Sequence, residues 1–142
     1  MKTIYLKTLT KLKECPSLKH IDKDRGQIDV YEQRPAVQFP CALISISLPK
    51  RKNLTKTMQM CQCTVMVRLA FERFAEASNI TSQSRLNLAL QYYDTIDEIE
   101  SLLQGYGDAE MNAWECTSAI EEQRPDFDVI RLTFSTAFKK TI

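Results

Sequence analysis

The sequence predicts an α+β fold, in which a mostly antiparallel sheet carries two helices on one face and a long β-hairpin projects from it. Apolar and polar residues alternate along Met58–Phe71 and again along residues 41–48, which is the period of a strand. Residues 84–106 instead repeat apolar side chains every three or four positions, as a helix does. The strands come in groups, in the order α-β-β-β-α-β-β, which is typical of α+β proteins.

A single domain is expected over residues 1–142, because a chain of this length buries roughly two-thirds of its unfolded surface. Its N-terminal part contains an amphipathic helix at residues 3–13, with Thr3 as the N-cap. Residues 18–26 are highly charged and predict a solvated loop. Residues 27–31 predict a short strand, and an extended connection with prolines leads from it to the next strand.

Two strong strand patterns joined by a polar segment predict an antiparallel hairpin. The first covers residues 41–48 and is expected to stop at Pro49. The second is Met58–Phe71, whose odd positions form an apolar row that faces the core. The joining segment contains four basic residues and no acidic one; the basic residues are Lys50, Arg51, Lys52 and Lys56.

The second strand of this hairpin is too long for a compact domain. Its fourteen residues, at ~3.3 Å each, span roughly 46 Å, whereas a sphere of this chain length measures about 37 Å across. We therefore expect the hairpin, about residues 41–71, to project as an arm that carries Met58 and Met60. A neighbouring subunit would cover its unpaired edges. The alternative is a bend or bulge near Gln62.

The long helix occupies residues 84–106 in the C-terminal half. Ser82 or Ser84 is placed to cap its start, and Gly105 or Gly107 to end it.

Acidic residues follow the outer face of this helix, at Asp94, Asp97, Glu98 and Glu100. Paired carboxylates can serve as catalytic groups, but no base, histidine or set of metal ligands accompanies these four. A solvated helix face is the preferred interpretation.

Two closing strands are predicted at residues 111–120 and 128–139, joined by a turn at 123–126. The sole tryptophan, Trp114, is interpreted as a core or interface aromatic. In the connector before the long helix, Phe74 is expected to tuck under the chain.

The chain carries few groups for chemistry. Its three glycines exclude a glycine-rich phosphate cradle, and His20 is its only histidine. A formal net charge of +1 gives no general attraction to nucleic acid or membrane. No apolar run approaches the ~20 residues of a membrane span, and lysines interrupt any secretory signal. We expect no catalytic residue, metal or cofactor, and hence no enzyme.

Five cysteines are expected to be reduced thiols, mostly on apolar strand faces. Cys61 and Cys63 would lie on one side of a strand, about 7 Å apart. A structural zinc site needs a second pair of ligands, and the sequence has no second close cysteine pair. These two are interpreted as small core residues.

The pattern as a whole resembles small prophage structural proteins of the tail-terminator or tail-completion type from long-tailed phages. The resemblance rests on GQIDVYEQRPAVQFPCALISI at residues 26–46, VRLAFERFAEAS at 67–78 and ALQYYDTIDEIESLLQGY at 89–106. It implies a ring-forming α+β subunit, commonly a hexamer, at the head-proximal end of a tail. There it stops tube polymerisation and meets the head connector. Such proteins have no catalytic residues to carry over.

The resemblance also implies partners for the charged groups. The basic hairpin tip would face an acidic partner or DNA that passes through the ring, and the acidic helix face would meet a neighbouring subunit. Ordinary solvated surface is the alternative for both groups. The alternative function is a head–tail joining or neck adaptor that binds one partner without forming a ring. Either protein would belong to the virion, and to the host cytoplasm during assembly.

Overall fold

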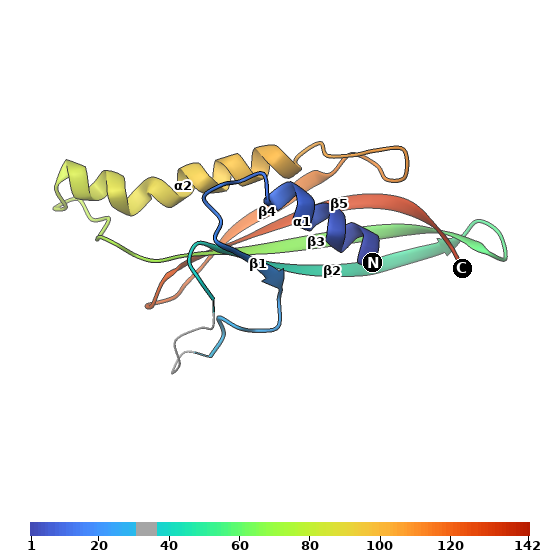
Figure 1. The fold of residues 1–142 in the computed structure, drawn as a ribbon, viewed down its shortest axis with the longest axis horizontal. Coiled ribbons are helices and arrows are strands. Elements are labelled where there is room, and N and C mark those ends of the chain that lie inside the picture. The colour runs from blue at the N-terminus through green and yellow to red at the C-terminus, as the bar shows by residue number, and fades with distance from the viewer. Residues whose placement is uncertain (31–36) are drawn as a thin grey trace.

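A computed structural model describes residues 1–30 and 37–142. Its seven elements confirm the α+β prediction and the order α-β-β-β-α-β-β. They are α1 (Lys2–Leu12), β1 (His20–Lys23), β2 (Cys41–Asn53), β3 (Met58–Phe71), α2 (Gln83–Leu103), β4 (Glu115–Glu122) and β5 (Asp128–Thr141). Figure 1 shows an elongated molecule, with both helices on one face of the sheet and the β2–β3 hairpin at one end.

The sheet is built around β3, as the sequence predicts. Its strand order is β1-β2-β3-β5-β4, and only the β1–β2 pair is parallel. β3 pairs with β2 on one side and with β5 along its whole length on the other. Its odd positions face the helices and pack in the main core. That core contains Cys63, Val65, Val67, Leu69 and Phe71, with Ile4 and Leu12 from α1 and Ile96, Ile99 and Leu103 from α2.

The hairpin therefore projects as a three-stranded arm rather than as two strands. β5 runs beside β3 from Asp128 to Thr141, and the backbone N–H of Ile142 donates to Thr57 O at 2.6 Å in the hairpin turn. We call residues 48–60 together with 137–142 the distal arm. This part of the sheet extends beyond α1 in Figure 1.

Pro49 does not end β2, which contradicts the prediction. The strand continues to Asn53, and its register with β3 shifts between Ser47 and Lys50. β1 accompanies β2 only as far as Ile44, so Pro49 lies on an edge where its missing N–H breaks no ladder. The shift lies in β2, opposite Gln62, close to the place where the sequence allowed a bulge as the alternative to a projecting arm. β3 itself continues through this region without interruption.

The first strand is also misplaced in the sequence prediction. Residues 27–30 are not a strand, and the first strand is His20–Lys23, inside the segment that predicted a loop. Ile28 is fully buried by a turn that follows Gly26, whose φ is +80°, so its apolar character reflects packing rather than alternation. Tyr31 and the start of the predicted connection lie outside the described residues.

The helices begin slightly earlier than predicted. Met1, not Thr3, occupies the N-cap position of α1. Ser82 occupies that position in α2, although its side chain makes no capping hydrogen bond. Gly105 follows the end of α2 with φ +78°, the left-handed conformation expected of a terminating glycine. No helix among the described residues is long and apolar enough to cross a membrane.

Three details around the closing strands differ from or refine the prediction. Phe74 does not tuck under the connector, since 64% of it is exposed. Trp114 is buried, in agreement with a core role, and precedes β4 rather than belonging to it. Within β4, the register with β5 shifts between Cys116 and Ser118, so Ile120 does not share the sheet face of Cys116. The shift turns Ile120 to the opposite side of the sheet.

A buried ion-pair network lies on the sheet face opposite the helices. Arg68 of β3 contacts Asp29 Oδ1 at 2.9 Å, Glu122 Oε1 at 2.8 Å and Asp24 Oδ2 at 3.5 Å. Next to it, Arg124 pairs with Asp126 at 2.8 Å and with Asp29 at 3.7 Å. The network fastens the segment after β1 to the sheet.

A smaller apolar core lies beside this network and covers the same sheet face. It is formed by Ile28, Cys41, Leu43, Ala70, Phe127 and Val129. This end of the sheet is therefore packed on both faces.

Because of this network, we expect the free energy of unfolding to fall in acid. Hydrogen bonds from Arg68 lower the pKa of Asp29, and hydrogen bonds from Arg124 lower that of Asp126. Each folded-state pKa lies below the unfolded value of about 3.9, so the stabilisation is present above that pH and is lost as the pH falls through the folded value. Urea midpoints followed by Trp114 fluorescence should decline from about pH 5 to pH 2. A flat profile would contradict the assignment.

Candidate functional site

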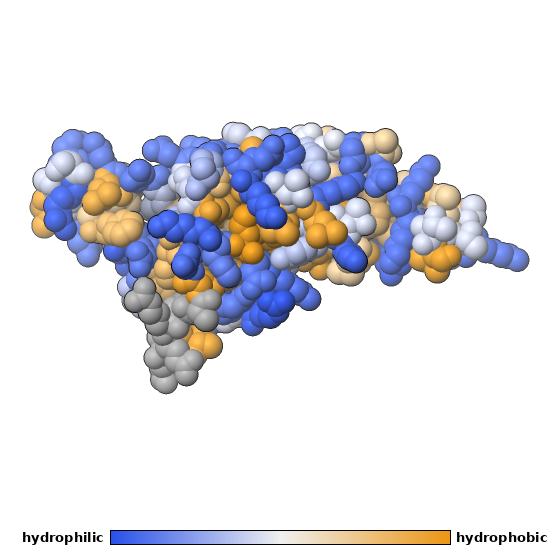
Figure 2. All heavy atoms as spheres, viewed as in Figure 1, coloured by the Kyte–Doolittle hydropathy of each residue, from blue (hydrophilic) through white to orange (hydrophobic). Residues whose placement is uncertain are grey.

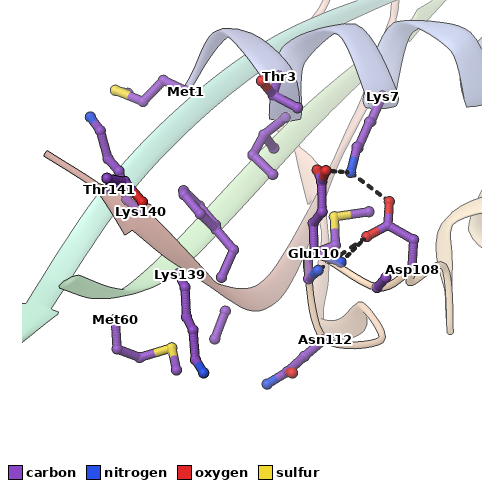
Figure 3. Close-up of a pocket in the computed structure, with 15 residues that line it drawn as sticks. Met1, Thr3, Lys7, Met60, Asp108, Glu110, Asn112, Lys139, Lys140 and Thr141 are labelled. Carbon is purple, nitrogen blue, oxygen red and sulfur yellow. Dashed lines mark hydrogen bonds and ion pairs between the residues drawn. The ribbon is translucent and has the colours of Figure 1, made fainter. Parts of the chain in front are cut away.

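A groove of about 630 Å³ lies at the base of the distal arm. Figure 3 shows that four parts of the chain form it, one of which is β3 through Met60. Met1 and Thr3 lie at the start of α1, as its N-cap and in its first turn. Asp108 and Glu110 belong to the loop between α2 and β4, and the last residues of β5 complete the wall.

One wall of the groove is held by an ion-pair cluster. Lys7 of α1 contacts both Asp108 and Glu110, the latter at 3.2 Å. Asp108 Oδ1 also accepts hydrogen bonds from the backbone N–H groups of Glu110 and Met111, at 2.8 and 3.1 Å. Hydrogen bonding to Asp108 raises the pKa of Lys7, and the same contact lowers the pKa of Asp108. The charge of Lys7 is therefore neutralised inside the protein.

Apolar side chains line the groove between its charged rims. Ile4 of α1, Met60 of β3, and Met111 and Phe138 all contribute to its lining. Met111 forms an isolated bridge with Phe138, and its sulfur accepts a hydrogen bond from Trp114 Nε1 at 3.2 Å. The buried tryptophan thus supports the loop that forms this wall.

The open edge of β5 borders the groove. β4 accompanies β5 only as far as Ser135, and the last backbone contact on that side in the described chain joins Asn112 N to Ala137 O at 2.9 Å, next to the Met111 bridge. Lys139 and Lys140 follow, with no ion pair to any described residue. The charge left unneutralised at this rim is therefore positive.

The distal arm collects more positive charge than the sequence pattern indicates. Lys50, Arg51, Lys52 and Lys56 are exposed there as expected. The register adds Lys139 and Lys140, which pair across from Met60 and Gln59 of β3. The arm thus carries six basic residues and no acidic one, whereas the remaining chain contains 13 basic and 18 acidic residues. The near-neutral net charge of the chain therefore conceals an uneven distribution, with an excess of positive charge on the distal arm and an excess of negative charge in the rest of the chain.

One row of side chains crosses the arm on the face turned away from the helices. Cross-strand register places Lys52, Met60 and Lys139 side by side on β2, β3 and β5. Figure 3 shows Met60 and Lys139 pointing the same way. A half-buried thioether between two cationic side chains gives this row apolar and charged character together.

The edge of β2 is poorly suited to pairing with another strand. Beyond Ile44 its outer side has no described partner strand. This stretch contains Pro49, a register shift and three consecutive basic residues, which are the devices that block edge-to-edge pairing. Contacts to the arm are therefore expected through its side chains.

The predicted acidic residues lie elsewhere. Asp94, Asp97 and Glu98 are exposed on α2, on the side of the helix opposite Ile96, Ile99 and Leu103. No described ion pair joins them to the distal arm within one chain.

The N-terminal half of α2 extends past the sheet at the end away from the hairpin (Figure 1). Apolar side chains gather there in Figure 2. Leu88 and Leu90 are 47% and 38% exposed, and Ile80 before the helix is 90% exposed. A second, smaller pocket of about 210 Å³ lies beneath this part of the helix, lined in part by Phe71, Phe74 and Tyr92.

The buried thiols are unsuited to nucleophilic chemistry. Burial raises the pKa of Cys41 and Cys63 to about 11, so both remain protonated at neutral pH. Cys61 and Cys63 are fully buried, as expected of small core residues. Residues 1–30 and 37–142 contain no group of three or more His, Cys, Asp or Glu side chains placed to hold a metal ion.

A search of protein-family models found no match to this chain, and no curated protein matches it.

Proposed function

We propose that this protein is a phage virion assembly protein of the tail-terminator kind. In this proposal its subunits form a closed ring at the head-proximal end of a tail, and the expected number of subunits is six. The ring stops tube polymerisation and contacts the tail-tube and head-connector proteins. It acts without catalysis, within the virion and, during assembly, in the host cytoplasm.

The observation that carries the proposal is the distal arm with the groove at its base. A three-stranded extension with six basic residues and an apolar groove supplies surface that one chain leaves uncovered. The overhang of α2 supplies a different uncovered surface at the other end. Unlike surfaces at opposite ends support head-to-tail contacts, which form rings when the rotation closes. Positive charge on the arm also suits DNA that passes through such a ring.

The mass of the protein in solution tests this proposal. Light scattering across a concentration series, with reducing agent present, should show the 16.4 kDa chain giving way to a closed species near six times that mass. Electron microscopy of the same sample should show rings. A monomer at every concentration would contradict ring formation and favour the neck-adaptor alternative, in which the same arm binds one partner.

A further inference from the structure

We propose that the groove at the base of the distal arm receives the overhanging half of α2 from a second copy of this chain. The inference rests on the proposed ring and names the surfaces that would form it. It follows from three properties of the groove: its apolar lining, its unneutralised lysines and its position.

The apolar lining of the groove needs an apolar partner. Ile4, Met111 and Phe138 contribute to this lining. On α2, Leu90 is exposed on the helix face that also carries Asp94, whereas Leu88, two positions earlier, lies on the other side and lines the second pocket. Burial of such side chains removes apolar surface from water and favours association. The same chain thus carries both the apolar groove and an exposed leucine, Leu90, that can enter it.

The charges at the two surfaces are complementary. Lys139 and Lys140 line the groove, and Lys7, Asp108 and Glu110 together carry one net negative charge, so these five side chains leave the groove with one net positive charge. Asp94 and Asp97 follow Leu90 by one and two turns of α2. A helix that places Leu90 against the lining can therefore present Asp94 and Asp97, which share its face, to the two lysines, and this supports both affinity and orientation.

The geometry requires two copies. The overhang of α2 and the distal arm lie at opposite ends of the elongated molecule in Figure 1, so one chain cannot satisfy both surfaces. The contact is heterologous, with a different patch on each partner, and each subunit retains one free groove and one free helix for its next neighbours. On the other side of the arm, the edge of β2 is poorly suited to strand addition, so a partner there is also expected to bind through side chains.

Charge reversal with mixing tests the contact. Lys139→Glu/Lys140→Glu and Asp94→Lys/Asp97→Lys each place like charges in the proposed contact. Each variant alone should associate at least about tenfold more weakly than wild type. An equimolar mixture should recover association, because every groove of one variant then meets a helix of opposite charge from the other. Sedimentation velocity measures each sample, and circular dichroism verifies that each variant is folded.

A matched control is Lys13→Glu/Lys19→Glu, which makes the same charge change on exposed lysines away from the distal arm. It should associate as wild type does. If wild type assembles and both groove and helix variants assemble equally well, the contact is wrong and the ring proposal stands. If wild type remains monomeric, the ring proposal fails and the contact fails with it. If the groove variant loses binding to a duplex DNA fragment and mixing restores no association, nucleic acid is the occupant and the contact is overturned.

Discussion

Replacing Arg68 with methionine is expected to destabilise the fold by about 3–5 kcal/mol, the cost of removing one partner from a buried ion pair. The Arg68 side chain is only 10% exposed and contacts three carboxylates, those of Asp24, Asp29 and Glu122. Methionine leaves these carboxylates without their cation in a poorly hydrated site. Urea unfolding followed by Trp114 fluorescence measures the loss. The acid dependence of the midpoint should also become shallower, because Asp29 loses the contact that lowers its pKa.

Arg131→Met is the matched control. Arg131 lies directly across from Arg68 on β5, and it makes no ion pair with a described residue. Like charges at facing positions are destabilising, so removing the charge of Arg131 costs no favourable ion pair. We expect this substitution to change the free energy of unfolding by less than about 1 kcal/mol. Equal losses in the two variants would show that the network contributes nothing specific to stability.

Trp114→Ala is expected to cost about 3–5 kcal/mol, the usual penalty for emptying a buried aromatic site. Trp114 is 1% exposed and packs against Tyr106 and Phe134 at centroid distances of 5.6 and 6.0 Å. Its backbone N–H donates to Tyr106 O at 2.9 Å, and its carbonyl accepts from Gly105 N at 2.7 Å. The side chain therefore supports the loop that carries one wall of the groove.

Trp114→Phe separates the packing of the buried ring from the hydrogen bond that the indole makes to the wall of the groove. Phenylalanine keeps much of the buried volume but removes the indole N–H that donates to Met111 Sδ. We expect it to recover more than half of the stability lost in the alanine variant, as measured by circular dichroism during thermal unfolding. An alanine variant as stable as wild type would mean that this aromatic cluster does not hold the loop.

The main strand of the fold could be predicted because its pattern and its environment agree. Met58–Phe71 alternates, lies in the middle of the sheet and has the predicted bounds. β1 could not be found in this way, since its four residues are a short, charged edge strand whose burial is only partial. Pro49 misleads for a related reason. Proline ends a central strand, but β2 is an edge strand at that point, and only the tertiary pairing reveals the difference.

The candidate site is only partly accessible to sequence reasoning. The length of β3 relative to a compact domain is enough to predict a projecting arm and to place Met60 on it. Lys139 and Lys140 join the arm only through the register of β5 with β3, which no local pattern specifies. The groove combines α1, β3, β5 and the loop before β4, and the pairing of Lys7 with Asp108 joins residues 101 positions apart in sequence.

Because the edge of β2 is poorly suited to pairing with another strand, the surface of the distal arm is expected to evolve in a particular way. Backbone pairing is nearly indifferent to sequence, so a partner bound through an open strand edge is difficult to exchange by mutation. Where proline, a register shift and lysines block that mode, recognition depends on individual side chains that do not hold the fold together. Single substitutions on the distal arm can then change its partner while the core remains intact. A surface of this kind can follow a changing partner over short evolutionary times.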